Sequence, residues 1–395
     1  MYGLEHQDHH FSSLNSVRSL PVRLAEAGYR TARIGKFHVG PESVYAFQSV
    51  LSGGTANDPA SIGRSPVEMA DLTREFLSVS DARPFFLYFA TDDPHRANAT
   101  LPSGKPTFDT YPEPNRFGNR KGGYPGVTEV TFKPGDVLVP PFLPDTPASR
   151  AELAQYYQSV ARLDQGVGRL IRLLKETGHY DHTLIVYLSD NGPAFPGAKT
   201  TLYDPGIRLP LIVRLPGSTR PGAVQDAMVT WADLTPTLLD VAGAWRAEQA
   251  GEFDGRSFRA ALDGTPVRGW NEVYAPHSLH EITMYYPMRM VRDRRYKLIH
   301  NLASGLAFPF ALDLVQAPTW VDLQRRGETV YGRRPIAQFI HRPAFELYDL
   351  KADPHEIKNL ADDPTHRAVF DAMVAKLKAF QDRTLDPWRH KWVYE

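Results

Sequence analysis

Residues 184–188 form a short apolar run, Leu-Ile-Val-Tyr-Leu, which is followed by Ser-Asp-Asn-Gly. A run of this length, rich in apolar and β-branched residues, predicts a buried strand of a parallel sheet. Asp190 and Asn191 then lie at its carboxyl end, the edge at which open α/β sheets place their binding sites. A carboxylate beside an amide carbonyl suits a hard cation such as Ca²⁺. A simple turn after the strand is the competing interpretation, and the residues alone leave both open.

The first 282 residues alternate between apolar runs and amphipathic segments. The clearest helix covers residues 151–177, where apolar residues recur every three or four positions, and Ser149 with Glu152 has the spacing of a capping box. This alternation of strands and helices predicts an α/β fold, a mostly parallel sheet flanked by helices. The other expected strands cover residues 31–37, 84–90 and 209–215, and the other expected helices cover residues 16–28, 67–77 and 234–243.

The pattern changes near residue 283, where short segments rich in arginine and lysine begin. Residues 288–291 and 296–300 predict short, exposed antiparallel strands, and residues 345–350 predict another strand. Residues 370–380 predict a terminal amphipathic helix. We therefore expect a smaller α+β subdomain with an antiparallel sheet. The expected division is a catalytic domain over residues 1–282 and a C-terminal subdomain over residues 283–395.

Composition narrows the classes of partner. The 395 residues contain 45 Lys and Arg and 45 Asp and Glu, and this zero net charge argues against a nucleic-acid partner. No run approaches the roughly 20 apolar residues of a membrane span, so no membrane partner is expected. The chain has no cysteine, which excludes disulfides, thiolate metal sites and cysteine nucleophiles. The sequence leaves open whether the chain forms a homodimer.

Three short motifs place basic side chains next to expected strand ends. Lys36 and His38 stand two apart in Gly-Lys-Phe-His, so on a strand both would point to one face and form a pocket for an anion. His95 follows another expected strand in Asp-Pro-His-Arg, and Lys199 follows Asp190 by nine residues. Each of these has an ordinary explanation when taken singly, because basic residues at strand ends are usually solvated.

Taken together, in order and spacing, these motifs resemble the sulfatase family of the alkaline-phosphatase-like superfamily, over residues 1 to about 388. The resemblance implies the alkaline-phosphatase-like fold and a hydrolase of sulfate groups. It also implies a Ca²⁺ ion bound by Asp190 and Asn191, which supply only part of the roughly six to eight oxygens that Ca²⁺ prefers. The catalytic residues that the resemblance implies, as holders of the sulfate group, are Lys36, His38, His95 and, from the other side, Lys199.

Residues 280–284 and 286–289 resemble the sulfamidase (heparan N-sulfatase) branch of the family. This resemblance implies that His280, Glu281 and Arg289 bind the substrate, with Glu281 pairing with the glucosamine nitrogen or a hydroxyl. For Arg289 an interdomain salt bridge is an equal alternative. The implied reaction is hydrolysis of the S–N bond of N-sulfoglucosamine in heparan-type glycans. The alternatives are an O-sulfatase or phosphodiesterase of the same superfamily, and a non-catalytic protein that binds sulfated glycans.

The chain departs from the family pattern on its N-terminal side. Sulfatases use a formylglycine made from cysteine or serine in Cys/Ser-x-Pro-x-Arg, and the stretch that fits begins at Ser19. We interpret Ser19 as a helix cap rather than a nucleophile, because the helix that follows it matches one downstream of the family's nucleophile. The family's first strand also ends in two aspartates. Asp92 and Asp93 are not taken as their substitute, because they belong to the Pro-His motif.

From this departure we expect a chain that lacks the first strand and the nucleophile, has no sulfatase activity as written and is poorly soluble. Full-length relatives are expected to be periplasmic, secreted or lysosomal. His6, His9 and His10 resemble half of a zinc site, but no cysteine, helix or glutamate pattern supports zinc. The resemblance instead implies that these histidines border the sugar pocket.

Overall fold

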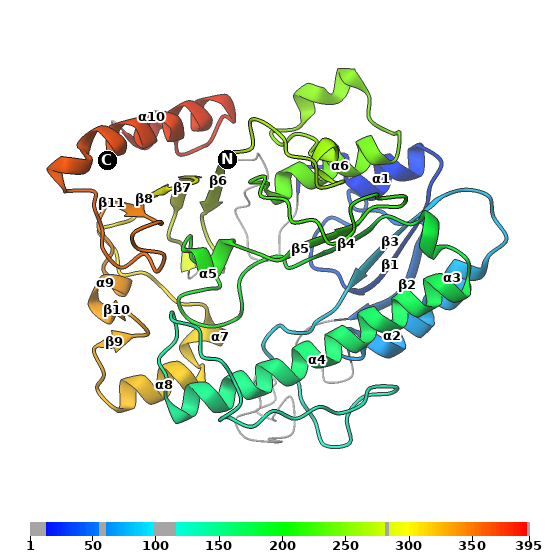
Figure 1. Cartoon of the computed structure of the whole chain (residues 1–395), viewed down its shortest axis with the longest axis horizontal. Coiled ribbons are helices and arrows are strands. Elements are labelled where there is room, and N and C mark those ends of the chain that lie inside the picture. Colours follow the sequence, from blue (N-terminus) through cyan, green and yellow to red (C-terminus); the bar gives the residue numbers. More distant parts are fainter. Residues whose placement is uncertain (1–12, 55–60, 98–115, 281–283, 393–395) are drawn as a thin grey trace.

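The computed structural model describes residues 13–54, 61–97, 116–280 and 284–392. Figure 1 shows two lobes, one built on strands β1 to β5 and the other on an antiparallel sheet beneath the C-terminal helix α10. The long helix α4 runs along the first lobe and reaches toward helix α8 of the second. None of the described helices is long and apolar enough to cross a membrane.

The first lobe contains a three-stranded parallel sheet in the order β2-β1-β3. Its strands are β1 (Arg30–Lys36), β2 (Ser49–Gly54) and β3 (Phe85–Ala90), which confirms two expected strands and adds β2. Strands β4 (Ile185–Leu188) and β5 (Leu211–Arg214) form a separate antiparallel pair. The intervening residues carry only the four-residue helix α5, too little for the crossover helix that a parallel connection requires.

Strands β3 and β4 are neighbours that do not pair with each other. Ile185 of β4 packs against the same apolar cluster as Phe85 and Phe89 of β3. Among the described residues, β3 pairs only with β1, and β4 pairs only with β5. Each strand therefore keeps one edge that no described strand occupies.

Helices cover both faces of this sheet. Helices α2 (Pro66–Leu72), α3 (Arg74–Ser78) and α4 (Pro147–Glu176) lie on one side, while α1 (Leu20–Glu26) and α6 (Leu234–Val241) lie on the other (Figure 1). Helix α4 begins four residues before its predicted start. The hydroxyl of Thr146 caps it by accepting a hydrogen bond from the Ser149 N–H at 3.2 Å, so the predicted capping box is wrong.

The second lobe contains a four-stranded antiparallel sheet in the order β11-β8-β7-β6. Helix α10 packs on one face of this sheet through Leu377 and Phe380. Strands β7 and β8 are largely buried, although the sequence predicted exposed strands. The sheet also begins before the expected boundary at residue 283, because β6 pairs with β7. The elements are β6 (Glu272–His277), β7 (Met288–Asp293), β8 (Tyr296–Asn301), β11 (Phe345–Asp349) and α10 (Arg367–Arg383).

Short elements connect the two lobes and fill the space between their cores. Helix α7 places Leu314 in a buried cluster with Trp320 of α8 and Leu153 of α4, so the segment between the lobes is firmly packed. These remaining elements are α5 (Asp204–Ile207), α7 (Leu312–Val315), α8 (Pro318–Arg325), β9 (Val330–Tyr331), β10 (Arg334–Pro335) and α9 (Ile336–Ile340).

Candidate active site

The carboxyl ends of β1, β3 and β4 bring charged residues of both signs together. Lys36 is the last residue of β1, while Asp92 and Asp190 each lie two residues past the ends of β3 and β4. Burial lowers the pKa of Lys36, and the nearby carboxylates of Asp190 and Asp92 oppose this shift. Lys199 adds to the lowering, which places it within electrostatic reach of Lys36. Lys36, Asp190 and Lys199, which the sequence analysis singled out, therefore lie near one another at these strand ends.

His95 lies in the same cluster. Burial, together with the positive charges of Lys199, Lys36 and Arg64, holds the pKa of His95 well below its usual 6.5. The imidazole is therefore neutral at neutral pH. Its Nδ1 lies 2.6 Å from the carbonyl oxygen of Arg96. Because a carbonyl can only accept, Nδ1 carries the proton and Nε2 carries the lone pair.

Lys199 reaches the cluster from a tightly wound loop that follows β4. The loop requires glycine at position 192, since a Cβ there would lie 2.1 Å from the carbonyl oxygen of Pro205. The Lys199 side chain is buried, and its ammonium donates a hydrogen bond to Asp313 Oδ2 at 2.8 Å. A lysine held in this way is pre-oriented, because an ion pair with low exposure fixes a side chain that would otherwise be flexible.

A network of buried ion pairs supports the turn that carries His95. Asp93 accepts hydrogen bonds from Arg64 at 2.8 Å and from Arg162 of α4 at 2.6 and 2.8 Å. Arg96 pairs with Glu152, and its guanidinium lies over the rings of Phe117 and Phe195. Asp93 and Arg96 are therefore structural, and both Asp93 carboxylate oxygens are already bound by arginine.

Asp190 and Asn191 are both exposed at the end of β4. Asp190 Oδ1 accepts a hydrogen bond from the Asn191 N–H at 2.9 Å, and the Asp190 carbonyl accepts one from Trp231 Nε1 at 3.3 Å. Their oxygens fit Ca²⁺ in kind. The part of the chain that the structure describes contains no group of three or more His, Cys, Asp or Glu side chains placed to hold a metal ion, so these two residues form an incomplete site.

Two predicted site residues, His38 and Arg289, differ from their expected placement. Strand β1 ends at Lys36, so the alternation that was to align His38 with it does not continue, and His38 is exposed. Arg289 is fully buried and pairs with Asp386 at 2.7 and 3.0 Å. This geometry favours the salt-bridge alternative for Arg289 and corrects its expected contact with substrate, since no part of it is exposed. The pair lies within the C-terminal lobe rather than between domains.

The remaining residues that the sequence analysis singled out are partly outside the described ranges. His280 is half-buried just after β6, whereas Glu281, His6, His9 and His10 lie outside the described residues. Ser19 occupies the N-cap position of α1, is buried, and donates a hydrogen bond from Oγ to the Val44 carbonyl at 2.6 Å. Ser19 therefore holds the predicted N-cap position, but its hydroxyl bonds to Val44 and does not cap the helix.

Asp313 is the residue of the cluster that the sequence analysis missed. It lies 114 positions beyond Lys199, on the four-residue helix α7, and nothing in its surrounding sequence marks it. Only the tertiary packing that brings α7 against the loop after β4 reveals the pair.

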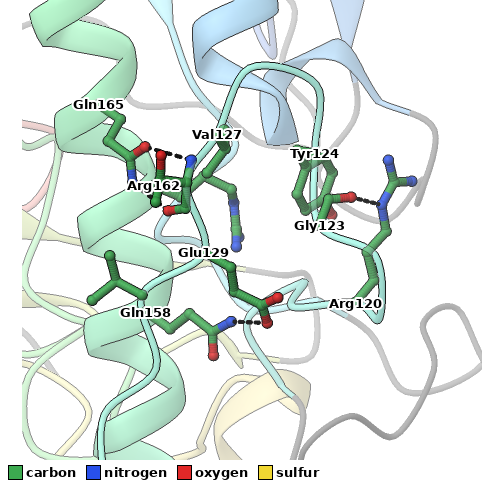
Figure 2. Close-up of a pocket in the computed structure, with 10 residues that line it drawn as sticks. Arg120, Gly123, Tyr124, Val127, Glu129, Gln158, Arg162 and Gln165 are labelled. Carbon is green, nitrogen blue, oxygen red and sulfur yellow. Dashed lines mark hydrogen bonds between the residues drawn. The ribbon is translucent and has the colours of Figure 1, made fainter.

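Two cavities among the described residues are lined by other side chains than Lys36, His95 and Lys199. Figure 2 shows one of about 20 Å³, between residues 120–130 and α4, with Arg162 in its wall. That volume holds about one water molecule and is too small for a sugar. The second cavity, of about 100 Å³, is lined by aromatic rings and by basic side chains that include Arg333 and His355.

Comparison with known proteins identifies the family. Residues 1–244 match the family model named Sulfatase, which is more than half of the chain. The chain belongs to the sulfatase family. Residues 197–322 of this sulfatase also match the model for the C-terminal region of N-sulphoglucosamine sulphohydrolase.

Individual relatives agree with this assignment. Human N-sulphoglucosamine sulphohydrolase is 41% identical over 98% of this chain and 78% of the human protein. An ulvan-active sulfatase of Formosa agariphila is 24% identical over 92% of this chain and 64% of its own length.

Solved structures show the fold. A protein from a glycosaminoglycan-metabolism locus of Bacteroides thetaiotaomicron has a TM-score of 0.69 at 17% identity, covering 99% of this chain and 83% of its own. A structure in complex with its substrate D-glucosamine-2-N,6-O-disulfate has a TM-score of 0.63 at 19% identity, covering 97% and 85%. The expected alkaline-phosphatase-like fold is confirmed.

Proposed function

We propose that this sulfatase acts on N-sulfoglucosamine units of heparan-type glycans, and that Lys36, His95 and Lys199 bind the sulfo group. The observation that carries the proposal is the convergence of these three side chains at the carboxyl edge of the first lobe's strands. The 41% identity to the human N-sulphoglucosamine sulphohydrolase supports the choice of substrate.

The roles of the residues follow from their charges. The ammonium groups of Lys36 and Lys199 neutralise the sulfo oxygens, and their burial strengthens this attraction. An anion bound beside His95 raises the pKa of the imidazole, so that His95 can gain a proton on Nε2. When the S–N bond breaks, the nitrogen leaves as an amine and needs that proton, which makes His95 the proposed general acid.

We further propose that Asp190 and Asn191 hold Ca²⁺. A bound Ca²⁺ would add positive charge beside a sulfo oxygen. Two residues cannot complete its coordination, so the remaining oxygens would come from water, substrate or residues outside the described ranges. His280 and Glu281 stay proposed sugar contacts, and His38 a proposed sulfate contact.

A second candidate, a protein that binds sulfated glycans without turnover, is favoured by one observation. The chain contains no cysteine, and Ser19, which begins the Ser-x-Pro-x-Arg stretch, is buried at the start of α1, where its hydroxyl donates a hydrogen bond to the Val44 carbonyl. No residue of the sequence given is therefore assigned as the nucleophile, and the covalent route has no starting group.

Calorimetric titration of the purified chain with N-sulfoglucosamine tests the proposed function. We expect saturable binding of N-sulfoglucosamine and little binding of unsulfated glucosamine at the same concentrations. Equal binding of the two sugars would contradict the sulfo-group pocket. Release of inorganic sulfate in the same sample would support turnover, whereas binding without release would favour the second, purely binding candidate.

A further inference from the structure

Asp313 places a negative charge next to two of the three side chains proposed to bind the sulfo group. Its carboxylate lies beside Lys199 and close enough to His95 to influence it electrostatically. Burial disfavours the ionised form of Asp313, but Lys199 outweighs burial and lowers the pKa of the carboxyl group. Asp313 therefore stays ionised at neutral pH and can only accept hydrogen bonds.

One oxygen of the Asp313 carboxylate has no hydrogen-bond donor among the described residues. Asp313 Oδ2 accepts from Lys199 at 2.8 Å, whereas the buried Oδ1 has no hydrogen-bond partner among the residues that the structure describes. The side chain is only 11% exposed, so bulk water does not readily satisfy Oδ1. A buried, ionised and unpartnered oxygen is costly, and a donor from a ligand would relieve that cost.

Helix α7 holds this oxygen in place. Leu314, which follows Asp313 on the helix, and Ala311, the N-cap residue of α7, are fully buried in the cluster that also contains Trp320, whereas Leu312 is exposed. The carboxylate therefore cannot swing away from an incoming anion without disturbing packed neighbours.

The chemistry of sulfated sugars suggests what Oδ1 accepts. In a sulfamate, the atom that bridges carbon and sulfur is a nitrogen that carries a hydrogen. In a sulfate ester, the bridging atom is an oxygen with lone pairs only. A fixed carboxylate beside the sulfo group would attract the first and repel the second, which is how a site discriminates between isosteric ligands.

We propose that Asp313 selects N-sulfated over O-sulfated sugars by accepting a hydrogen bond from the sulfamate N–H on Oδ1. This inference rests on the proposed function and assigns the specificity of the same site. Both Lys199 and Asp313 lie within residues 197–322, the stretch that matches the N-sulphoglucosamine sulphohydrolase model. The simpler alternative is that Asp313 only orients Lys199. Replacing Asp313 would then change the affinity for both kinds of sugar by the same factor.

Two sugars that differ at a single atom test the proposal. N-sulfoglucosamine and glucose 2-sulfate carry the sulfo group at the same carbon, through N–H in one and through oxygen in the other. By calorimetric titration we expect the wild-type chain to bind N-sulfoglucosamine about 10- to 100-fold more tightly, the value of one hydrogen bond to a charged group. In Asp313→Asn the ratio should fall toward one, mainly because glucose 2-sulfate binds better.

Two further variants test whether the position of the Asp313 oxygens, rather than charge or folding, determines the preference. Asp313→Glu keeps the charge beside Lys199 but moves the oxygens, so it should fold normally and still lose most of the preference. Asp322→Asn removes a partly exposed carboxylate of α8 and should leave the ratio unchanged. Circular dichroism and melting temperature confirm that each variant is folded.

The outcomes separate the two proposals. If wild-type protein binds both sugars equally, or if the Asp313 variants weaken both by the same factor, the selectivity inference is overturned while the sulfo-group pocket stands. If wild-type protein binds neither sugar, the proposed function itself fails, and the inference fails with it.

Discussion

Asp93→Ala is expected to lower the free energy of unfolding by about 3–5 kcal/mol, the usual cost of removing one partner from a buried ion pair. The Asp93 side chain has no exposure, and it is the shared partner of Arg64 and Arg162. Without it, two buried guanidinium groups face each other with no compensating charge. Urea unfolding followed by circular dichroism measures this loss.

Asp71→Ala is the matched control for this measurement. Asp71 pairs with Arg169, also on α4, but its side chain is 49% exposed. Removing a pair of this kind costs at most about 1 kcal/mol. If Asp93→Ala unfolded at the same urea concentration as Asp71→Ala, the buried network could not be the support of the His95 turn.

Lys199→Ala is expected to weaken the binding of N-sulfoglucosamine by about 10- to 100-fold, because one charge-assisted hydrogen bond to the sulfo group is lost. The variant also leaves Asp313 without its cation, so that an unbalanced carboxylate faces the incoming anion. Calorimetric titration at constant pH and salt measures the change in affinity.

Lys133→Ala provides the control, since Lys133 is an exposed lysine in the long loop before α4. Its removal should change the affinity less than twofold, because exposed charges are screened by salt. An equally small change in Lys199→Ala would show that Lys199 does not contact the sulfo group.

Much of the fold could be predicted because its signals are local. The apolar runs that became β3 and β4 and the periodicity that became α4 are readable without knowledge of the rest of the chain. The capping box failed for the opposite reason. Glu152 has the right spacing from Ser149, but Arg96 and Thr319, which are distant in the sequence, bind its carboxylate.

The candidate site divides in the same way. Lys36, His95 and Asp190 follow strands that end at one edge, so their proximity could be predicted from the order of the elements. The pairs Lys199–Asp313 and Arg289–Asp386 join residues about a hundred positions apart. No local pattern encodes such pairs, because the packing of distant helices and strands creates them.

The most direct test of the sulfo-group pocket is a crystal structure of this chain soaked with N-sulfoglucosamine. We expect the sulfur atom to lie between the Lys36 and Lys199 ammonium groups and His95 Nε2, with the sugar nitrogen toward Asp313 Oδ1. Density for the sugar in the 100 Å³ cavity beside Arg333 instead, with the cluster at the sheet edge empty, would contradict the account.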